Sequence, residues 1–313
     1  MARNGVSARE QARKLQQEQE RKQKMQSLLL RVGVVVLAVA VVVGLTLWVV
    51  NRGDNGSYTE GPAPAASNEQ GGFVLTSSSE LAEGDDIGTV DSENLEDAST
   101  PDSPEDLPVG VEPREEGEPP HVVIYTDAAC PACGNFEAAY HQLLTEWVDA
   151  GAITLEYRSV QFQPMAYSAR AANAFACMAD SHPEHFSPFL GTVTAERAQG
   201  AEYSNEELAA RAESDYGVDI SECVEGGDYR AFVNYATGLA SANNVTATPS
   251  IFVDGELVEE IMNTGEVILS AVQEYQDETG EQLVEGIEDD LEDVDEDEVE
   301  EGDVEQDDAA EDE

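Results

Sequence analysis

Hydrophobic and polar positions divide the chain into stretches with different patterns. Residues 32–50 form an unbroken apolar run of nineteen residues without a charge. A helix of that length spans about 28 Å, close to the hydrocarbon thickness of a bilayer. Residues 53–117 show little periodic apolar content, and 20 of the 33 residues in 281–313 are acidic. Only the stretch between them, roughly 119–279, has the apolar periodicity of a folded domain.

Within that stretch the pattern predicts an α/β domain. A short apolar strand at 121–125 is followed by a helix at 134–148, where apolar residues recur at helical spacing. An alternating strand at 152–157 is expected to lie parallel to the first. An Asp-Gly turn at 254–255 predicts a strand–turn–strand unit over 247–258. Further helices are predicted at 164–179, 182–194, 204–216, 227–243 and 266–276.

A Cys-Pro-Ala-Cys motif at 130–133 stands between the first strand and the first helix. A haem attachment site would need His after the second Cys, where Gly134 stands, and a zinc site would need a second close ligand pair. A structural disulfide is unusual at a helix start. The context therefore favours a redox dithiol of the thioredoxin type.

The chemistry of a helix start assigns different roles to the two cysteines. Cys130 would lie where unpaired N–H groups and the helix dipole stabilise a thiolate, so we expect a lowered pKa and the role of nucleophile at an exposed position. Pro131 suits the first helical turn because its missing N–H costs nothing there. Cys133, one turn deeper, would be the shielded resolving thiol, with Ala132 between them. No metal ligand set or cofactor motif is recognised in the sequence.

The N-terminal part predicts a membrane anchor. Residues 1–26 are basic, and residues 27–50 are expected to be a transmembrane signal anchor rather than a cleavable signal peptide, because the apolar run is too long. The basic flank places the N-terminus in the cytoplasm and the remainder outside the membrane. That compartment is oxidising, in keeping with four cysteines that all lie in the folded part.

After Val50 the chain contains 63 acidic residues, seven arginines and no lysine. Such charge argues against nucleic-acid binding. It leaves open a solvated surface, an adaptation to high salt, or a tail that attracts basic clients. Residues 51–117 are expected to be a disordered acidic linker and residues 281–313 a disordered acidic tail, since both are poor in apolar residues.

Two segments carry a family resemblance: YTDAACPACG at 125–134 and VTATPSIFVDG at 245–255. With them, the chain resembles a membrane-anchored, actinobacterial DsbA-like thiol:disulfide oxidoreductase. The resemblance implies a thioredoxin fold over 118–280 with a helical insert at about 164–243. It also implies a cis Thr248–Pro249 bond that faces the dithiol, with the Thr248 backbone pairing with a client peptide. From the sequence alone, a trans proline starting an edge strand is the alternative.

The resemblance further implies a structural disulfide between Cys177 and Cys223; two buried free thiols are the alternative. Two positions depart from the family pattern. Ala132 stands where strongly oxidising relatives have His, and Ile124 stands where relatives carry a buried acid. Asp127 is expected to be exposed and is not assigned as a proton relay. The oxidising strength therefore stays open.

These observations predict an enzyme that introduces disulfides into exported client proteins outside the cell membrane. The resemblance implies reoxidation by a membrane partner of the DsbB or VKOR type. A reductase or isomerase would use the same residues with the opposite electron flow. An anchored binding module with a non-catalytic Cys pair is the alternative outside the enzyme class.

Overall fold

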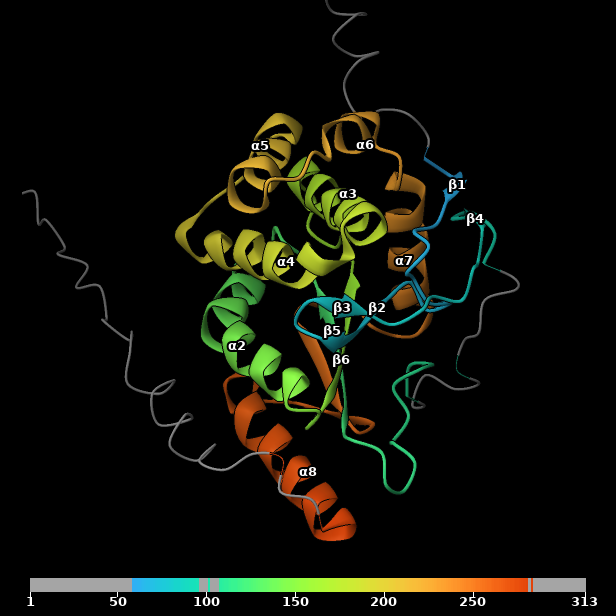
Figure 1. Ribbon diagram of the computed structural model, residues 1–313. Coiled ribbons are helices and arrows are strands. Elements are labelled where there is room, and N and C mark those ends of the chain that lie inside the picture. The colour runs from blue at the N-terminus through green and yellow to red at the C-terminus, as the bar shows by residue number, and fades with distance from the viewer. Residues whose placement is uncertain (1–57, 96–100, 102–106, 281–282, 284–313) are drawn as a thin grey trace, which may run out of the picture. The chain divides into compact units, whose positions relative to one another are not determined.

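The computed structural model describes residues 58–95, 101, 107–280 and 283 (Figure 1). Within these ranges no helix is both long enough and apolar enough to cross a bilayer. The predicted basic segment at 1–26 and membrane anchor at 27–50 lie outside the described residues, as does the acidic tail apart from residue 283.

A six-stranded sheet with the order β3-β2-β6-β5-β7-β8 forms the centre of the domain. β5 and β6 are parallel and are connected through helix α2, while β7 and β8 are antiparallel. The predicted β-α-β start and strand–turn–strand end are therefore both present. The strands of this sheet are β2 (Phe73–Ser77), β3 (Glu80–Leu81), β5 (His121–Thr126), β6 (Thr154–Ser159), β7 (Ser250–Val253) and β8 (Glu256–Leu257).

The turn between β7 and β8 has the predicted two-residue form. Val253 pairs with Glu256, and the two residues between them, Asp254 and Gly255, have φ values of 48° and 82°. Positive φ at both central positions is the hairpin geometry for which Asp-Gly is a preferred pair.

Between β6 and β7 the chain forms the predicted helical insert, which Figure 1 shows gathered beside one end of the sheet. Helices α2 and α8 precede and follow that block in the thioredoxin-like part. The helices are α2 (Pro131–Asp149), α3 (Ala166–Ser181), η1 (Pro183–His185), α4 (Phe186–Ala195), η2 (Glu196–Gln199), α5 (Asn205–Tyr216), α6 (Ser221–Gly226), α7 (Arg230–Ala242), η3 (Ile261–Asn263) and α8 (Thr264–Thr279).

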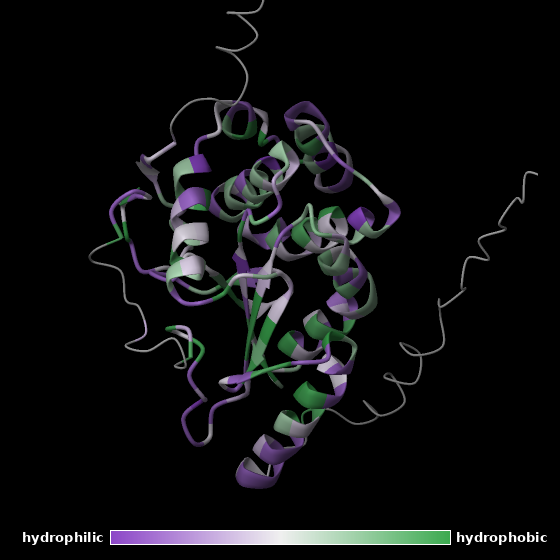
Figure 2. Cartoon of the chain, turned by 180° about the vertical axis from the view of Figure 1, so that it is seen from behind, coloured by the Kyte–Doolittle hydropathy of each residue, from purple (hydrophilic) through white to green (hydrophobic). Residues whose placement is uncertain are grey.

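The strand β5 is buried on both faces, and its alternate side chains enter two different apolar clusters. Val122 and Ile124 join the main core with residues of α2, α3, α4 and α8. Val123 and Tyr125 join a smaller cluster that includes Ala240 of α7. Such a central strand is continuously apolar, which agrees with the green strands at the centre of Figure 2.

The expectation of a disordered linker over residues 51–117 is wrong for the described part of that range. β2 pairs antiparallel with β6 and extends the sheet, and β1 (Glu60–Pro62) pairs with β4 (Thr89–Asp91). The Phe73 side chain is 1% exposed. Its ring centroid lies 4.9 Å from that of Phe186 and 5.9 Å from that of Phe232. Composition missed these strands because they are short and lie in a stretch that is otherwise rich in Gly, Ser, Asp and Glu.

A buried ion pair on β6 fastens the same N-terminal extension to the sheet. Arg158 Nε lies 2.6 Å from Glu156 Oε1, and both side chains are 2% exposed. The guanidinium also donates to the carbonyl oxygens of Val109 and Gly110 at 2.9 and 2.8 Å. Asn68 Nδ2 donates to Glu156 at 2.8 Å. Two separate parts of the predicted linker are thus held by polar groups that would be costly to leave unpaired.

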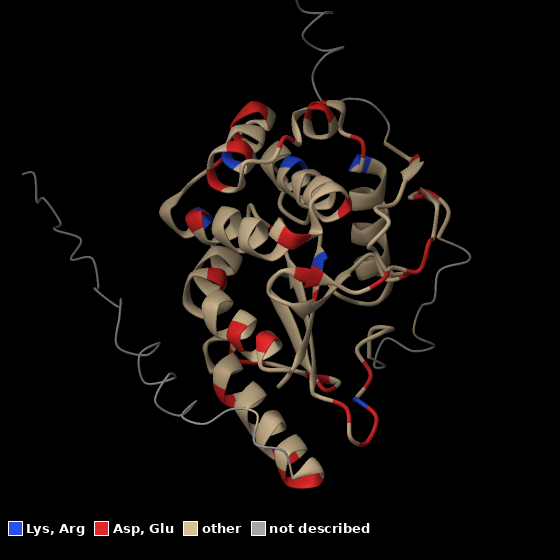
Figure 3. Cartoon of the chain, in the orientation of Figure 1, with Lys and Arg blue, Asp and Glu red and all other residues tan. Residues whose placement is uncertain are grey.

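Charge on the described part of the chain is strongly one-sided. Figure 3 shows acidic residues spread over helices and loops, with few basic ones among them. The described ranges contain six arginines and no lysine.

Candidate active site

The Cys130 side chain lies where β5 leads into α2. The helix begins at Pro131, three residues before the predicted start, and Cys130 is its N-cap with φ −85° and ψ 120°. Pro131 takes the first helical turn, as expected, where its missing N–H has no partner to lose. The N–H groups of the first turn are left free to face the Cys130 sulfur.

The two cysteines are free thiols and differ in exposure in the expected order. Cys130 is 5% exposed and Cys133 is 0% exposed. The expectation of an exposed Cys130 is therefore wrong in degree, because the loop before β7 covers the sulfur. Pro131 and Ala132, between the two cysteines, are the exposed residues of the motif.

The local environment separates the pKa values of the two thiols. The Cys133 thiol is hydrogen-bonded to the Cys130 sulfur, and this hydrogen bond is the largest of the influences on the pKa of Cys130, which is lowered to about 5. The backbone N–H groups of Cys133 and Ala132 act in the same direction, while partial burial opposes them. Burial raises the pKa of Cys133 far above its usual range. A thiolate on Cys130 beside a neutral Cys133 thiol follows.

Thr248 and Pro249, which lie far from the dithiol in the sequence, are next to it in the fold. Tyr125 near the end of β5 pairs with Ser250 at the start of β7, which brings the residues before β7 beside the cysteine loop. Cys130 Sγ lies 3.3 Å from the carbonyl oxygen of Thr248. The Thr248–Pro249 peptide bond is cis, as the family resemblance implied.

Asp127 is buried, not exposed as the sequence suggested. It is 1% exposed, and its carboxylate accepts hydrogen bonds from Ala129 N, Phe162 N, Gln163 N and Ser168 Oγ at 2.8–2.9 Å. Burial raises the pKa of this carboxyl, and the N–H donors act against that rise.

Three of these four hydrogen bonds, from Phe162, Gln163 and Ser168, join the cysteine loop to the segment after β6. The Asp127 N–H in turn lies 3.5 Å from Cys133 Sγ. Asp127 is therefore a carboxylate committed to holding the loop, a role for which the sequence offers no signal beyond its place in the motif.

The structure agrees with the sequence that position 124 carries no buried acid. Ile124 is 0% exposed and belongs to the main apolar core, so its position supplies no acid beneath the dithiol.

Arg197, which sequence reasoning did not single out, donates from the helical insert to the carbonyl oxygen of Ala129 at 2.9 Å. The two residues are 68 apart, so no local pattern could have indicated this contact.

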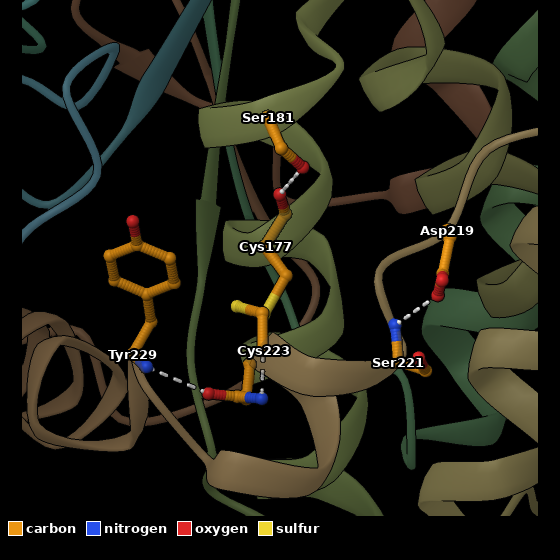
Figure 4. Close-up of a disulfide and its surroundings, with 7 residues drawn as sticks. Cys177, Ser181, Asp219, Ser221, Cys223 and Tyr229 are labelled. Carbon is orange, nitrogen blue, oxygen red and sulfur yellow. Dashed lines mark hydrogen bonds between the residues drawn. A yellow bond between two sulfur atoms is a disulfide. The ribbon is translucent and has the colours of Figure 1, made fainter.

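The second cysteine pair forms a disulfide within the insert (Figure 4). Cys177 of α3 and Cys223 of α6 are bonded, as the resemblance implied, across a sequence separation of 46. In the described residues, no group of three or more His, Cys, Asp or Glu is placed to hold a metal ion.

Comparison with known families supports the fold. A thioredoxin family model matches residues 115–274, which is half of the chain and includes both cysteines of the motif and Pro249. The chain therefore belongs to the thioredoxin family. No protein of curated function matches it.

Several solved structures are similar to parts of this chain. Reduced DsbA from Mycobacterium tuberculosis is 29% identical, with a TM-score of 0.45, over 56% of this chain and 89% of that one. The disulfide bond oxidoreductase DsbG of the same organism is also 29% identical, with a TM-score of 0.45, over 56% and 84%. MdbA, a thiol-disulfide oxidoreductase from Actinomyces oris, is 22% identical with a TM-score of 0.44, over 53% and 83%. These similar structures are DsbA-type thiol-disulfide oxidoreductases, the kind of protein that the sequence resemblance named.

Proposed function

We propose that this protein is a thiol:disulfide oxidoreductase that introduces disulfides into exported proteins through Cys130 and Cys133. The single observation that carries the proposal is the placement of the two thiols, with Cys130 at the N-cap of α2, 3.3 Å from the Thr248 carbonyl oxygen, and Cys133 fully buried. This placement lowers the pKa of Cys130 to about 5. A stabilised thiolate is a good leaving group, so the reduced form is favoured and the disulfide form is a strong electron acceptor.

The proposed reaction takes two thiol–disulfide exchanges. A client thiolate attacks Cys130 Sγ in the oxidised enzyme, a client–Cys130 disulfide forms, and Cys133 leaves and takes up a proton. A second client thiolate then attacks the client sulfur of that mixed disulfide, and Cys130 leaves as a thiolate. The client loses two electrons and gains a disulfide, and the enzyme ends with both cysteines reduced.

The structure offers a reason for attack at Cys130 rather than Cys133. Cys133 is 0% exposed, so a client cannot reach its sulfur, although its neighbour Ala132 lies on the surface. The Cys130 sulfur lies next to the Thr248 carbonyl, where a client peptide would bind. An extended client peptide bound to the Thr248 backbone would bring its cysteine to Cys130 first.

The cellular setting belongs to the same proposal. A signal anchor at 27–50 would hold the domain outside the membrane, where its clients are exported and disulfides persist. A membrane reoxidase of the DsbB or VKOR type would accept the two electrons from Cys130 and Cys133 and restore the disulfide.

Equilibration of the purified protein with glutathione buffers tests the direction of electron flow. A potential near about −120 mV is expected for a donor of disulfides, and one near about −270 mV would instead indicate a reductase. The matched chemical test is oxidation of a reduced, unfolded model client. A wild-type protein that neither oxidises such a client nor reduces insulin, like its Cys130→Ser control, would point to a binding module.

A further inference from the structure

The backbone of Ala129, the residue before the nucleophile, is held on both sides by charged groups. The Ala129 N–H donates to Asp127 Oδ1 at 2.9 Å, and the Ala129 carbonyl oxygen accepts from Arg197 Nε at 2.9 Å. The N–H of Cys130 donates to the Asp127 carbonyl oxygen, also at 2.9 Å. The residue before the nucleophile therefore has both of its backbone groups fixed, one of them by a cation.

Arg197 itself has little freedom to move. Its side chain is 14% exposed, and Nη1 donates to the Ala201 carbonyl oxygen at 3.3 Å and to Glu202 Oε1 at 3.1 Å. Its Nη2 lies 3.9 Å from Met165 Sδ. These contacts come from insert residues before and after Arg197 in the sequence, and together they hold the guanidinium toward the cysteine loop.

The segment that bears Arg197 also touches the first turn of α2 directly. A Cβ atom placed on Gly134 would lie 2.5 Å from Ala198 N and 3.0 Å from the Thr194 carbonyl oxygen. Real Cβ atoms do not approach so closely, so only glycine permits η2 to lie this near the turn after Cys133. The distance between the insert and the dithiol is therefore set by backbone contact.

We propose that Arg197 is a positioning residue for Cys130, through which the helical insert holds the Ala129–Cys130 peptide and places a positive charge beside the nucleophile. The inference rests on the proposed function, and it adds a role for the insert in the chemistry of the dithiol. Arginine is the suitable residue because its fork can bond several acceptors at once while it keeps its charge.

A cation at this position would stabilise the Cys130 thiolate because the surrounding ionised groups are acidic. The ionisable groups bonded to the loop or to Arg197 are Asp127, Cys133 and Glu202. Asp127 and Glu202 are acids, and Cys133 is neutral when Cys130 is a thiolate. In this strongly acidic protein Arg197 opposes the repulsion that these carboxylates exert on a Cys130 thiolate.

The test is a titration of the Cys130 thiolate by its ultraviolet absorbance in the full-length reduced protein, with the glutathione equilibrium measured in parallel. In Arg197→Gln the Cys130 pKa should rise by about 0.5–1 unit, and the glutathione equilibrium should shift about three- to tenfold toward the disulfide. Arg197→Lys keeps the charge and should recover at least half of that shift.

Two further variants decide the outcome. Arg211→Gln is the matched control, because Arg211 is an insert arginine bonded to Glu196 and Asp215 and not to the loop, and it should change neither value. Glu202→Gln removes the carboxylate that Arg197 pairs with and should lower the Cys130 pKa. Glu202 is exposed, so this variant remains informative if Arg197→Gln does not fold.

Failure of this inference differs from failure of the proposed function. If wild-type Cys130 titrates far below about 8.5 but Arg197→Gln matches Arg211→Gln, or Glu202→Gln leaves the value unchanged or raises it, Arg197 has no such role. If wild-type Cys130 itself titrates near about 8.5, the proposed function loses its basis.

Discussion

The sulfur of Cys130 and the carbonyl oxygen of Thr248 lie 3.3 Å apart, although the two residues are separated by 118 positions. The contact closes the active site, because one partner carries the reactive sulfur and the other ends the loop before β7. It also explains why Cys130 is nearly covered at the start of its helix. A client cysteine must reach the sulfur alongside the Thr248 backbone.

Mixed disulfides with clients should accumulate in Cys133→Ser and not in Cys130→Ser. Cys133→Ser cannot form the Cys130–Cys133 disulfide, so its mixed disulfide forms when the Cys130 thiolate attacks a client disulfide and displaces one client sulfur as a thiolate. This mixed disulfide persists because no Cys133 thiol is present to attack Cys130 and release the client. Non-reducing electrophoresis and mass spectrometry of whole-cell extracts measure it. Clients trapped mainly by Cys130→Ser would reverse the assigned roles.

The stability of the reduced form should rise with pH relative to that of the oxidised form. The Cys130 pKa is lowered to about 5 in the folded protein, so its thiolate adds stability above the unfolded pKa of about 8.5 and loses it as pH falls through about 5. Between these values the difference in unfolding free energy should change by up to about 1.4 kcal/mol per pH unit.

Denaturant unfolding of both redox forms at several pH values measures that difference. Carboxyl groups far from the dithiol have the same surroundings in both redox forms, so their contributions cancel. Cys133, whose pKa burial raises, adds nothing below about pH 8.5. Reduced Cys130→Ser is the control and should lack the slope. A difference that does not vary with pH in the wild type would contradict a stabilised thiolate.

Phe73→Ala should destabilise the domain by about 3–5 kcal/mol, because the ring is 1% exposed and contacts Phe186 and Phe232. Glu80→Gln, an exposed change in the neighbouring strand, should change the free energy of unfolding by no more than about 0.5 kcal/mol.

A chain that begins at residue 58 should fold, whereas one that begins at 118 should not. Equal stability of these two chains would mean that the extension is dispensable.

Replacing Cys177 and Cys223 together with alanine should lower stability by about 2–4 kcal/mol, since the bond closes a long loop. Thermal unfolding measures the loss, and peptide mapping without reductant checks the bond in the wild type. The glutathione equilibrium of the Cys130–Cys133 pair should be unchanged. Free alkylation of both residues in the native oxidised protein would contradict the bond.

The sequence by itself determined the order of the main strands and helices after residue 120 and the place of the dithiol. The strand at 121–126, the helix that begins beside Cys130 and the Asp-Gly hairpin are each specified by residues that lie next to one another in the chain. Periodicity, capping preference and turn chemistry are local, so they can be recognised without the fold.

Only the tertiary structure decided what surrounds the sulfurs. Three contacts tie the cysteine loop to distant parts of the chain: Cys130 with the Thr248 carbonyl, the Asp127 carboxylate with Phe162 N, and the Ala129 carbonyl with Arg197. Their partners lie 118, 35 and 68 positions apart. The strand at 73–77 likewise depends on an edge that β6 offers, not on its own composition. Whether a polar residue is buried, or a short apolar segment becomes a strand, depends on which distant surface it meets, and packing alone sets that.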